Sequence, residues 1–279
     1  MLTVVLGLST ALLWGLPDVP LAVAVRRVGP TAVLAGSLVI GTILIAPVGL
    51  FIDLPDIGRR GLLLAAFDGL LMAVAYGIAY NAFARCPISI VTPIISCEGA
   101  AAAAIAIGFG ERPGIGMAVL LLVAVLGVVL VGTSGRSGAT VSRSGVAFAV
   151  VGALVWGLVL FLGGPVTDEL GAYWGFFFVR SFASLAMLPF FFRGSIREGI
   201  RSEPWRILVW AAGDTLGNLC YFAAAASGPV ALAGVLAAQF ALFGTLAGVV
   251  GLGERLKVHQ WVGVAIVVAA VSGVAAISA

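Results

Sequence analysis

The sequence predicts an all-α, polytopic membrane protein with ten transmembrane helices arranged as two inverted five-helix repeats. Two features of composition indicate the membrane: of 279 residues, 62% are hydrophobic and 10% are charged. A soluble domain carries about 25% charged residues, so this chain has too few polar groups to cover a surface in water. The third observation is a set of motifs that occurs twice in the same order, and it predicts the repeat.

Ten stretches are long and apolar enough to be spanning helices, each of which needs about 20 predominantly apolar residues. They are residues 2–24, 31–51, 61–83, 88–108, 114–132, 145–165, 172–192, 206–226, 230–250 and 259–277. Proline, glycine and charged residues separate them. Arg85-Cys86-Pro87 and Ser227-Gly228-Pro229 are matching short turns before the fourth and ninth stretches.

The repeat is carried by a Trp-Gly pair and a Gly-Glu-Arg turn. Trp14 lies 96 residues before Gly110, and Trp156 lies 97 residues before Gly253. The predicted units are therefore residues 1–132 and 145–279, joined by a linker at 133–144 that is rich in glycine and serine. Five helices are an odd number, so the second unit enters the membrane from the opposite side. An inverted repeat places a substrate site near the midplane, between the halves.

Loop arginines and lysines predict the orientation, because cytoplasmic loops carry the excess of positive charge. One side has three, Arg59, Arg60 and Arg112. The other side has eleven: Arg26, Arg27, Arg85, Arg136, Arg143, Arg193, Arg197, Arg201, Arg206, Arg255 and Lys257. This count places both termini away from the cytoplasm. The polar loop 193–205 is interpreted as a short amphipathic helix on the membrane surface, with an irregular loop as the alternative.

These motifs also resemble a known family. Trp14-Gly15, the turns at Gly110-Glu111-Arg112 and Gly253-Glu254-Arg255, and the Gly-rich fifth helix of each half are similar to the EamA-type domain of the drug/metabolite transporter (DMT) superfamily. The resemblance covers the whole chain, with one domain in each half. It implies a ten-helix secondary transporter with helices one to four and six to nine around a central cavity. Helices five and ten are then peripheral or at a dimer contact, and the termini of such proteins are commonly cytoplasmic.

Two opposite charges lie deep in the predicted spans, Glu98 in the fourth and Arg180 in the seventh. A charge at the centre of a bilayer costs roughly 2.5–3.5 kcal/mol on insertion scales, so each needs a reason. We expect the two side chains to meet, either as a gated ion pair with a proton-binding carboxylate or as a permanent pair that fixes helix packing.

Asp68 and Asp214 occupy corresponding places in the two halves. Helical spacing puts Asp68 on one stripe with Met72, Tyr76 and Tyr80, and Asp214 on another with Asn218 and Tyr221. Acids aligned with amide and phenol groups suit the wall of a substrate cavity. The alternative is a structural role in hydrogen bonding between helices, at about 1 kcal/mol per contact.

Three further residues are candidates for substrate binding. Trp14 and Asp18 are one turn apart on the first span, beside prolines that permit a kink. Such a kink serves either a moving helix or a static bend. Gln239, in the ninth span, lies near the position that matches Glu98 and offers hydrogen bonds without charge.

Several kinds of chemistry find no support. The sequence has no His/Cys cluster, Ser-His-Asp set or phosphate-binding glycine loop with lysine, so we expect no enzyme activity, metal or cofactor. The three cysteines are spaced unlike metal ligands and suit apolar packing. The net charge of +3 is spread over loops, which indicates membrane topology and not nucleic-acid binding.

The function predicted is secondary active transport by alternating access, moving a small polar or amphipathic metabolite such as an amino acid. Export is the favoured direction, and protons are the candidate coupling ion. Multidrug or cation efflux is the main alternative. A structural membrane subunit and a lipid-modifying enzyme are alternatives of another class. The expected partners are the small-molecule substrate and the lipid bilayer, the expected form is a monomer or homodimer, and the expected location is a bacterial inner membrane.

Overall fold

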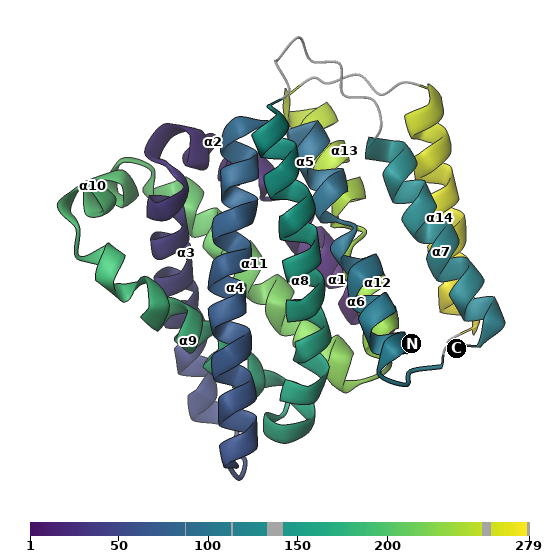
Figure 1. The fold of residues 1–279 in the computed structure, drawn as a ribbon, viewed down its shortest axis with the longest axis horizontal. Helices are drawn as coiled ribbons and strands as arrows, with labels where there is room; N and C mark the ends of the chain where they lie inside the picture. Colours follow the sequence, from purple (N-terminus) through teal and green to yellow (C-terminus); the bar gives the residue numbers. More distant parts are fainter. Residues whose placement is uncertain (87, 113, 133–141, 253–257, 278–279) are drawn as a thin grey trace.

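A computed structural model describes residues 1–279 apart from 87, 113, 133–141, 253–257 and 278–279 (Figure 1). All regular structure in the described part of the chain is helical. In chain order the helices are α1 (Leu2–Gly15), α2 (Asp18–Val28), α3 (Pro30–Ile45), the 3₁₀ helix η1 (Ala46–Phe51), α4 (Arg59–Arg85), α5 (Ile88–Ile95), α6 (Glu98–Gly108), α7 (Ile115–Gly132), α8 (Arg143–Leu170), α9 (Ala172–Phe191), α10 (Gly194–Ser202), α11 (Pro204–Ala226), α12 (Val230–Ala237), α13 (Phe240–Leu252) and α14 (Val258–Ile277).

Six stretches of the described chain are long and apolar enough to cross a membrane, by length and composition. They are Leu2–Val28, Pro30–Phe51, Arg59–Arg85, Arg143–Leu170, Ala172–Phe191 and Pro204–Ala226. The other four predicted segments are also helical, and two of them are divided into shorter helices. The chain is therefore a helical, multi-pass membrane protein.

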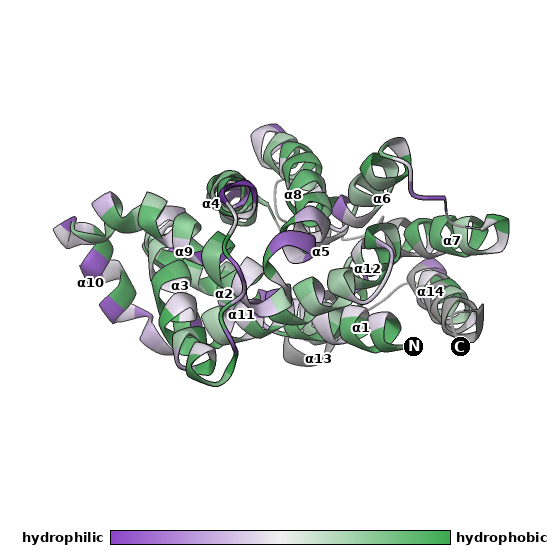
Figure 2. Cartoon of the chain, turned by 90° about the horizontal axis from the view of Figure 1, so that it is seen from below, coloured by the Kyte–Doolittle hydropathy of each residue, from purple (hydrophilic) through white to green (hydrophobic). Residues whose placement is uncertain are grey.

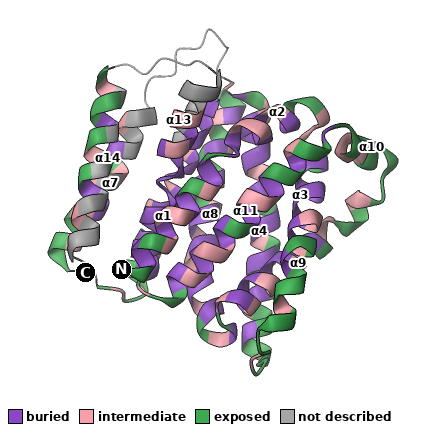
Figure 3. Ribbon diagram, turned by 180° about the vertical axis from the view of Figure 1, so that it is seen from behind, coloured by how far each residue is buried: buried purple, intermediate pink, exposed green. Residues whose placement is uncertain are grey.

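Helix α4 illustrates why lipid is the surrounding solvent. Its inward face carries the stripe predicted from the sequence, whose members are all buried: Asp68, Met72, Tyr76 and Tyr80. Its outward face carries large apolar side chains that are each more than half exposed: Leu63, Phe67, Leu70 and Val74. Figure 2 shows apolar residues over most of the helices, and Figure 3 shows that parts of the same helices are exposed. An apolar outer surface of this extent is stable in a bilayer and not in water.

Three of the predicted spans are broken near their middle. The first is divided between α1 and α2 at Leu16 and Pro17, as its prolines suggested. The fourth is divided between α5 and α6 at Ser96 and Cys97, which the sequence analysis did not predict.

The ninth span is divided at Ala238 and Gln239 without a proline. There the Gln239 side-chain amide donates to the Val235 carbonyl at 2.9 Å. The Gln239 backbone N–H bonds to Leu236 at 3.2 Å instead. The side chain thus takes the acceptor that a regular helix would give to its own backbone.

Two parts of the molecule lie away from its centre. Helices α7 and α14 pack side by side at one edge (Figures 1 and 2). At the other edge α10 forms the predicted amphipathic helix, with Arg197 and Arg201 exposed and Ile200 against α3. The start of α1 and the end of α14 lie at the same end of the bundle (Figure 1).

Some sequence predictions fall outside the described residues. These are most of the 133–144 linker and the second Gly-Glu-Arg turn at 253–255. The helix that follows the linker begins at Arg143 and continues past Pro165 to Leu170, so it is longer than the predicted 145–165.

Candidate functional site: a central cavity

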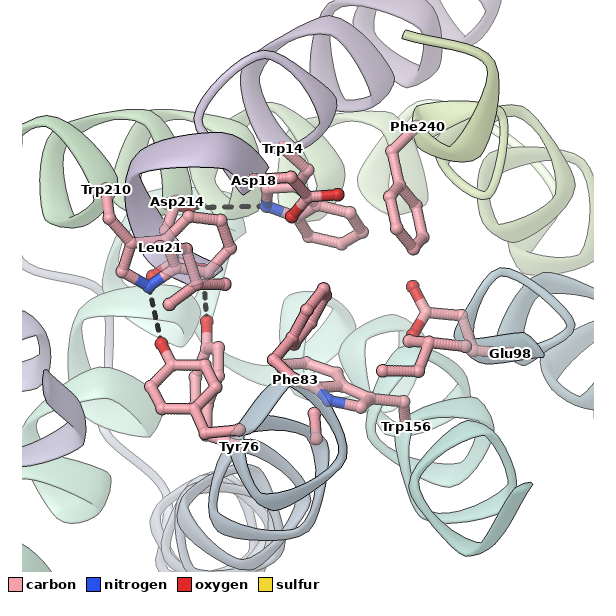
Figure 4. A pocket seen from close by; sticks show the side chains of 13 residues that line it. Trp14, Asp18, Leu21, Tyr76, Phe83, Glu98, Trp156, Trp210, Asp214 and Phe240 are labelled. Atoms are coloured by element: carbon pink, nitrogen blue, oxygen red, sulfur yellow. Dashed lines mark hydrogen bonds between the residues drawn. The ribbon is translucent and has the colours of Figure 1, made fainter. Parts of the chain in front are cut away.

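A small cavity of about 50 Å³ lies where the broken helices meet (Figure 4). We call it the central cavity. Its lining side chains come from α1, α2, α4, α5, α6, α8, α11 and α13. They are Trp14, Asp18, Leu21, Tyr76, Ala79, Tyr80, Phe83, Ile95, Glu98, Trp156, Trp210, Asp214 and Phe240. The described part of α7 and α14 contributes none of them, as expected for peripheral helices.

Two of the lining acids are the first residues of helices that follow a break. Asp18 begins α2 and Glu98 begins α6, and both side chains are buried. The N-terminus of a helix carries partial positive charge, which stabilises a carboxylate there. Thr92 also donates a hydrogen bond to Asp18 Oδ2 at 3.4 Å. The breaks in the first and fourth spans thus place two acids at the cavity wall.

Arg180 forms its ion pair with Asp214, and the predicted pair with Glu98 is wrong. Arg180 Nη1 donates to Asp214 Oδ2, and Nη2 donates to the Ser37 carbonyl at 2.8 Å. Glu98 instead points into the cavity from α6, beside Phe240 (Figure 4). The prediction failed because equal depth does not determine direction: α9 turns Arg180 toward α11 and α3.

The Asp214 carboxylate has further donors that hold it in place. Tyr76 donates to its Oδ1, and so does Asn218 Nδ2, at 3.1 Å. The Asn218 amide also lies 3.2 Å from the Tyr76 hydroxyl. The side chains predicted on the α4 and α11 stripes therefore do meet, and they surround one fully buried ion pair. Such a network is stable because every carboxylate oxygen is paired.

Aromatic rings form most of the remaining wall. Trp14 and Trp156, the two tryptophans of the repeat motif, lie with ring centroids 6.4 Å apart. Tyr76 packs edge-on against Trp156 at 4.6 Å. Trp210 donates its indole N–H to the Tyr80 hydroxyl, and Trp14 donates to the Asp214 carbonyl at 3.4 Å (Figure 4). The rings therefore form a packed aromatic wall in which each is held by its neighbours.

Four of the predicted site residues do not line the central cavity: Arg180, Asn218, Gln239 and Asp68. Asn218 donates a hydrogen bond to the Asp214 carboxylate, and Gln239 donates one to the Val235 carbonyl at the break in the ninth span. Asp68 is buried one turn before Met72 and is not among the residues that line this cavity, so its place in a cavity wall stays a prediction. The stripe of α4 is continuous, but the cavity occupies only the half that carries Tyr76 and Tyr80.

Sequence reasoning did not assign Phe83, Trp156, Trp210 and Phe240 to the site. Helical spacing held a signal for two of them, since Trp210 is one turn before Asp214 and Phe83 is two turns after Tyr76. Trp156 was recognised only as a motif landmark. Phe240 follows an unpredicted helix break, and no local signal indicated its direction.

The first Gly-Glu-Arg turn has a structural role. The Glu111 carboxylate accepts the backbone N–H groups of Val230 at 2.9 Å and Ala231 at 3.1 Å. These are the first residues of α12, whose free N–H groups need acceptors. A motif residue of the first half therefore caps a helix of the second half.

A bundle of membrane helices with broken segments around a polar, aromatic cavity is the architecture of a membrane transporter. Comparison with family models agrees: the EamA-like transporter family matches residues 1–133 and 143–276. The chain belongs to this family, and the protein is a multi-pass membrane transporter of the DMT type. The resemblance noted in the sequence is thereby confirmed.

Two other comparisons add the fold and no function. No curated protein matches the chain significantly. One solved structure, whose title reads only "Crystal structure of protein", is similar with a TM-score of 0.74 and 16% sequence identity. The alignment covers 97% of this chain and 95% of that one. At this identity the likeness concerns the fold alone.

Proposed function

We propose that this protein is a secondary active transporter that works by alternating access, with ten spans in two inverted units, residues 1–132 and 145–279. The broken fourth span (α5 and α6) corresponds to the broken ninth span (α12 and α13). The long helices α4 and α11 each bring an aspartate to the interior, together with two tyrosines from α4 and one from α11. Rocking of two such units exposes a midplane site to one side at a time.

The substrate class that best fits the central cavity is an organic cation. Its thirteen lining side chains include three carboxylates and seven aromatic rings, and none of these described side chains is cationic. Two of these carboxylates, Asp18 and Glu98, attract a cation directly, whereas Asp214 is neutralised by Arg180. Aromatic faces add cation–π attraction of about 0.5–2 kcal/mol each when desolvated. A buried acid near the membrane midplane is costly in free energy, so its presence indicates a function such as binding a cation.

An amino acid, the substrate class favoured from the sequence, would need a cation for its carboxylate. Arg180 is a buried cation of the interior, but its guanidinium is already bonded to Asp214 and to the Ser37 carbonyl. It does not line the cavity. The charge balance at the wall therefore favours the cation over the zwitterion, and this single observation carries the proposal.

Binding is measurable without a label, because Trp14, Trp156 and Trp210 line the cavity and report on ligands by fluorescence. Purified protein is titrated with tetraphenylphosphonium, with tetraphenylborate as an anion of the same shape, and with leucine as a zwitterion. We expect only the phosphonium to bind. Glu98→Gln and Asp18→Asn each weaken it about tenfold or more, since 1.4 kcal/mol of lost attraction is tenfold in Kd.

Asp56→Asn is the matched control, because Asp56 is an exposed acid in the loop before α4. It should leave the Kd unchanged. Equal binding of tetraphenylborate, or tight binding of leucine with the phosphonium inactive, would overturn the assignment to cations.

We further propose export coupled to proton entry across a bacterial inner membrane. One of the two acids Glu98 and Asp18 would take up one proton when a monovalent cation leaves, so the net charge of the cavity is the same with and without the substrate. In proteoliposomes, export of tetraphenylphosphonium should then follow an imposed pH gradient. If Glu98→Gln and Asp18→Asn both leave the proton dependence intact, proton coupling through these acids is excluded.

A further inference from the structure

Asp68 is a buried acid for which the cavity offers no explanation. Its side chain is fully buried in α4, and neither carboxyl oxygen has a hydrogen-bond partner. The other acids of the interior differ: Asp214 is bonded to Tyr76, Asn218 and Arg180, and Asp18 accepts from Thr92. Asp68 is thus buried in the same bundle without their partners.

The helices packed against α4 supply no group that compensates a charge on Asp68. Helices α3 and α5 contain no titratable side chain. The titratable and charged groups of the others are Asp18, Arg26 and Arg27 of α2, Arg143, Asp168 and Glu169 of α8, and Tyr173 and Arg180 of α9. Tyr221 of α11 also interacts electrostatically with Asp68, but its hydroxyl donates to the Leu160 carbonyl. Arg180 is bound to Asp214, Tyr173 donates to the Ile45 carbonyl, and Glu169 pairs with Arg60. None of them is bonded to Asp68.

A carboxylate in this position takes up a proton, because an ionised group without partners in an apolar interior is far less stable than the neutral acid. Both carboxyl oxygens are buried from bulk water, and the neighbouring helices pack closely against α4. A Cβ added at Gly69, the next residue, would lie 2.4 Å from the Val179 carbonyl of α9. One added at Gly61 would lie 2.9 Å from Leu170 of α8. In this conformation Asp68 is therefore a neutral acid.

Asp68 lies in the half of the bundle that is closed. The central cavity is lined by the C-terminal half of α4, at Tyr76 and beyond, and by the N-terminal half of α11. The opposite half is filled by packed side chains, including Phe176 and Phe222 with ring centroids 5.3 Å apart. Asp68 is eight residues before Tyr76, about 12 Å along the helix axis.

We propose that Asp68 is a proton-binding site of the closed half, which holds its proton while that half is packed and releases it when that half opens to water. This inference rests on the alternating-access proposal, and it concerns the proton alone, not the cargo. Opening would hydrate the carboxyl group, which then ionises and passes its proton to the water on that side. Closing would require the proton to be taken up again.

The equilibrium between the closed and open forms of this half then depends on pH. One proton is released on opening, so the ratio of open to closed protein rises up to tenfold for each unit of pH above the point where the exposed acid ionises. Asp68→Asn imitates the neutral acid and cannot release a proton. The variant should therefore remain closed in this half at every pH.

The test uses the full-length protein without substrate. Infrared spectra over a pH titration detect the carbonyl band of a protonated carboxyl group, and hydrogen–deuterium exchange reports opening of residues 60–75 and 160–176. We expect wild type to lose a carboxylic band and to exchange faster, relative to Asp68→Asn at the same pH, as pH rises. Asp56→Asn, in the exposed loop, should behave as wild type.

Identical exchange in wild type and Asp68→Asn at each pH, or a set of carboxylic bands that Asp68→Asn leaves unchanged, would overturn the proposal. Failure of tetraphenylphosphonium to bind would refute the cation assignment and would not affect this result, because no substrate takes part. If Asp68→Asn fails to fold, Asp68→Ser, which is neutral, polar and smaller, replaces it in the same comparison.

Discussion

The ion pair of Arg180 and Asp214 supports a quantitative prediction about Asp214→Asn. Asparagine keeps the shape of the side chain and its contacts with Tyr76 and Asn218, but it removes the charge that neutralises Arg180. Arg180 is fully buried, and its guanidinium cannot give up a proton in a protein. Breaking a buried pair by removing one partner costs about 3–5 kcal/mol, which is roughly 150- to 5,000-fold in the unfolding equilibrium.

The reverse change, Arg180→Met, should cost less, about 1–3 kcal/mol. Asp214 would retain its donors from Tyr76 and Asn218, and an acid left without a cation can take up a proton. The double variant should be more stable than Asp214→Asn alone, because no uncompensated charge remains.

Unfolding free energies come from reversible denaturation in mixed micelles, followed by circular dichroism. Glu169→Gln is the control, since Glu169 pairs with Arg60 at the surface at 3.2 Å, where a pair is worth about 0–1 kcal/mol. A loss below about 1 kcal/mol for Asp214→Asn would refute the reasoning, as would strictly additive effects in the double variant.

Three further predictions concern helix ends and packing. Glu111→Ala should cost about 0.5–2 kcal/mol, as for other lost helix caps, with faster amide exchange in the first turn of α12 and not elsewhere. Gly157→Ala should cost about 1–3 kcal/mol, measured as in the Asp214 series, because the new Cβ would lie 2.4 Å from Ala101 of α6; Gly108→Ala, with open space around it, should not. Hydrogen bonds from Arg27 and Arg206 lower the pKa of Glu203 below its ordinary 4.5. Glu203 therefore stabilises the fold fully above pH 4.5, and this stabilisation disappears as pH falls through the lower pKa of the folded state. Glu203→Gln should flatten the acid side of a plot of melting temperature against pH, and an unchanged acid side would contradict the assignment.

The turn at Glu111 is recognisable from local sequence, but its role depends on the tertiary structure. The motif was visible in the sequence as a turn that occurs once in each half. That its carboxylate caps α12, more than a hundred residues later, depends on how two distant segments meet. No local pattern encodes that meeting.

The sequence by itself determined the membrane class, the helical segments, the amphipathic α10 and a set of buried polar candidates. These follow from properties that act along a single helix: the length of an apolar run, the period of 3.6 residues and the cost of a charge in lipid. The kink at Pro17 belongs with them, because a proline acts on its own backbone.

Only the tertiary structure decided which candidates act together. Asp68, Glu98 and Asp214 are alike in the sequence, as acids inside apolar runs. In the packed bundle Asp214 pairs with Arg180, Glu98 faces the cavity, and Asp68 is buried without a hydrogen-bond partner. Composition and depth place a residue along its helix. The direction in which it faces across the bundle comes from the rotation of each helix against its neighbours, which close packing determines and a single sequence does not reveal.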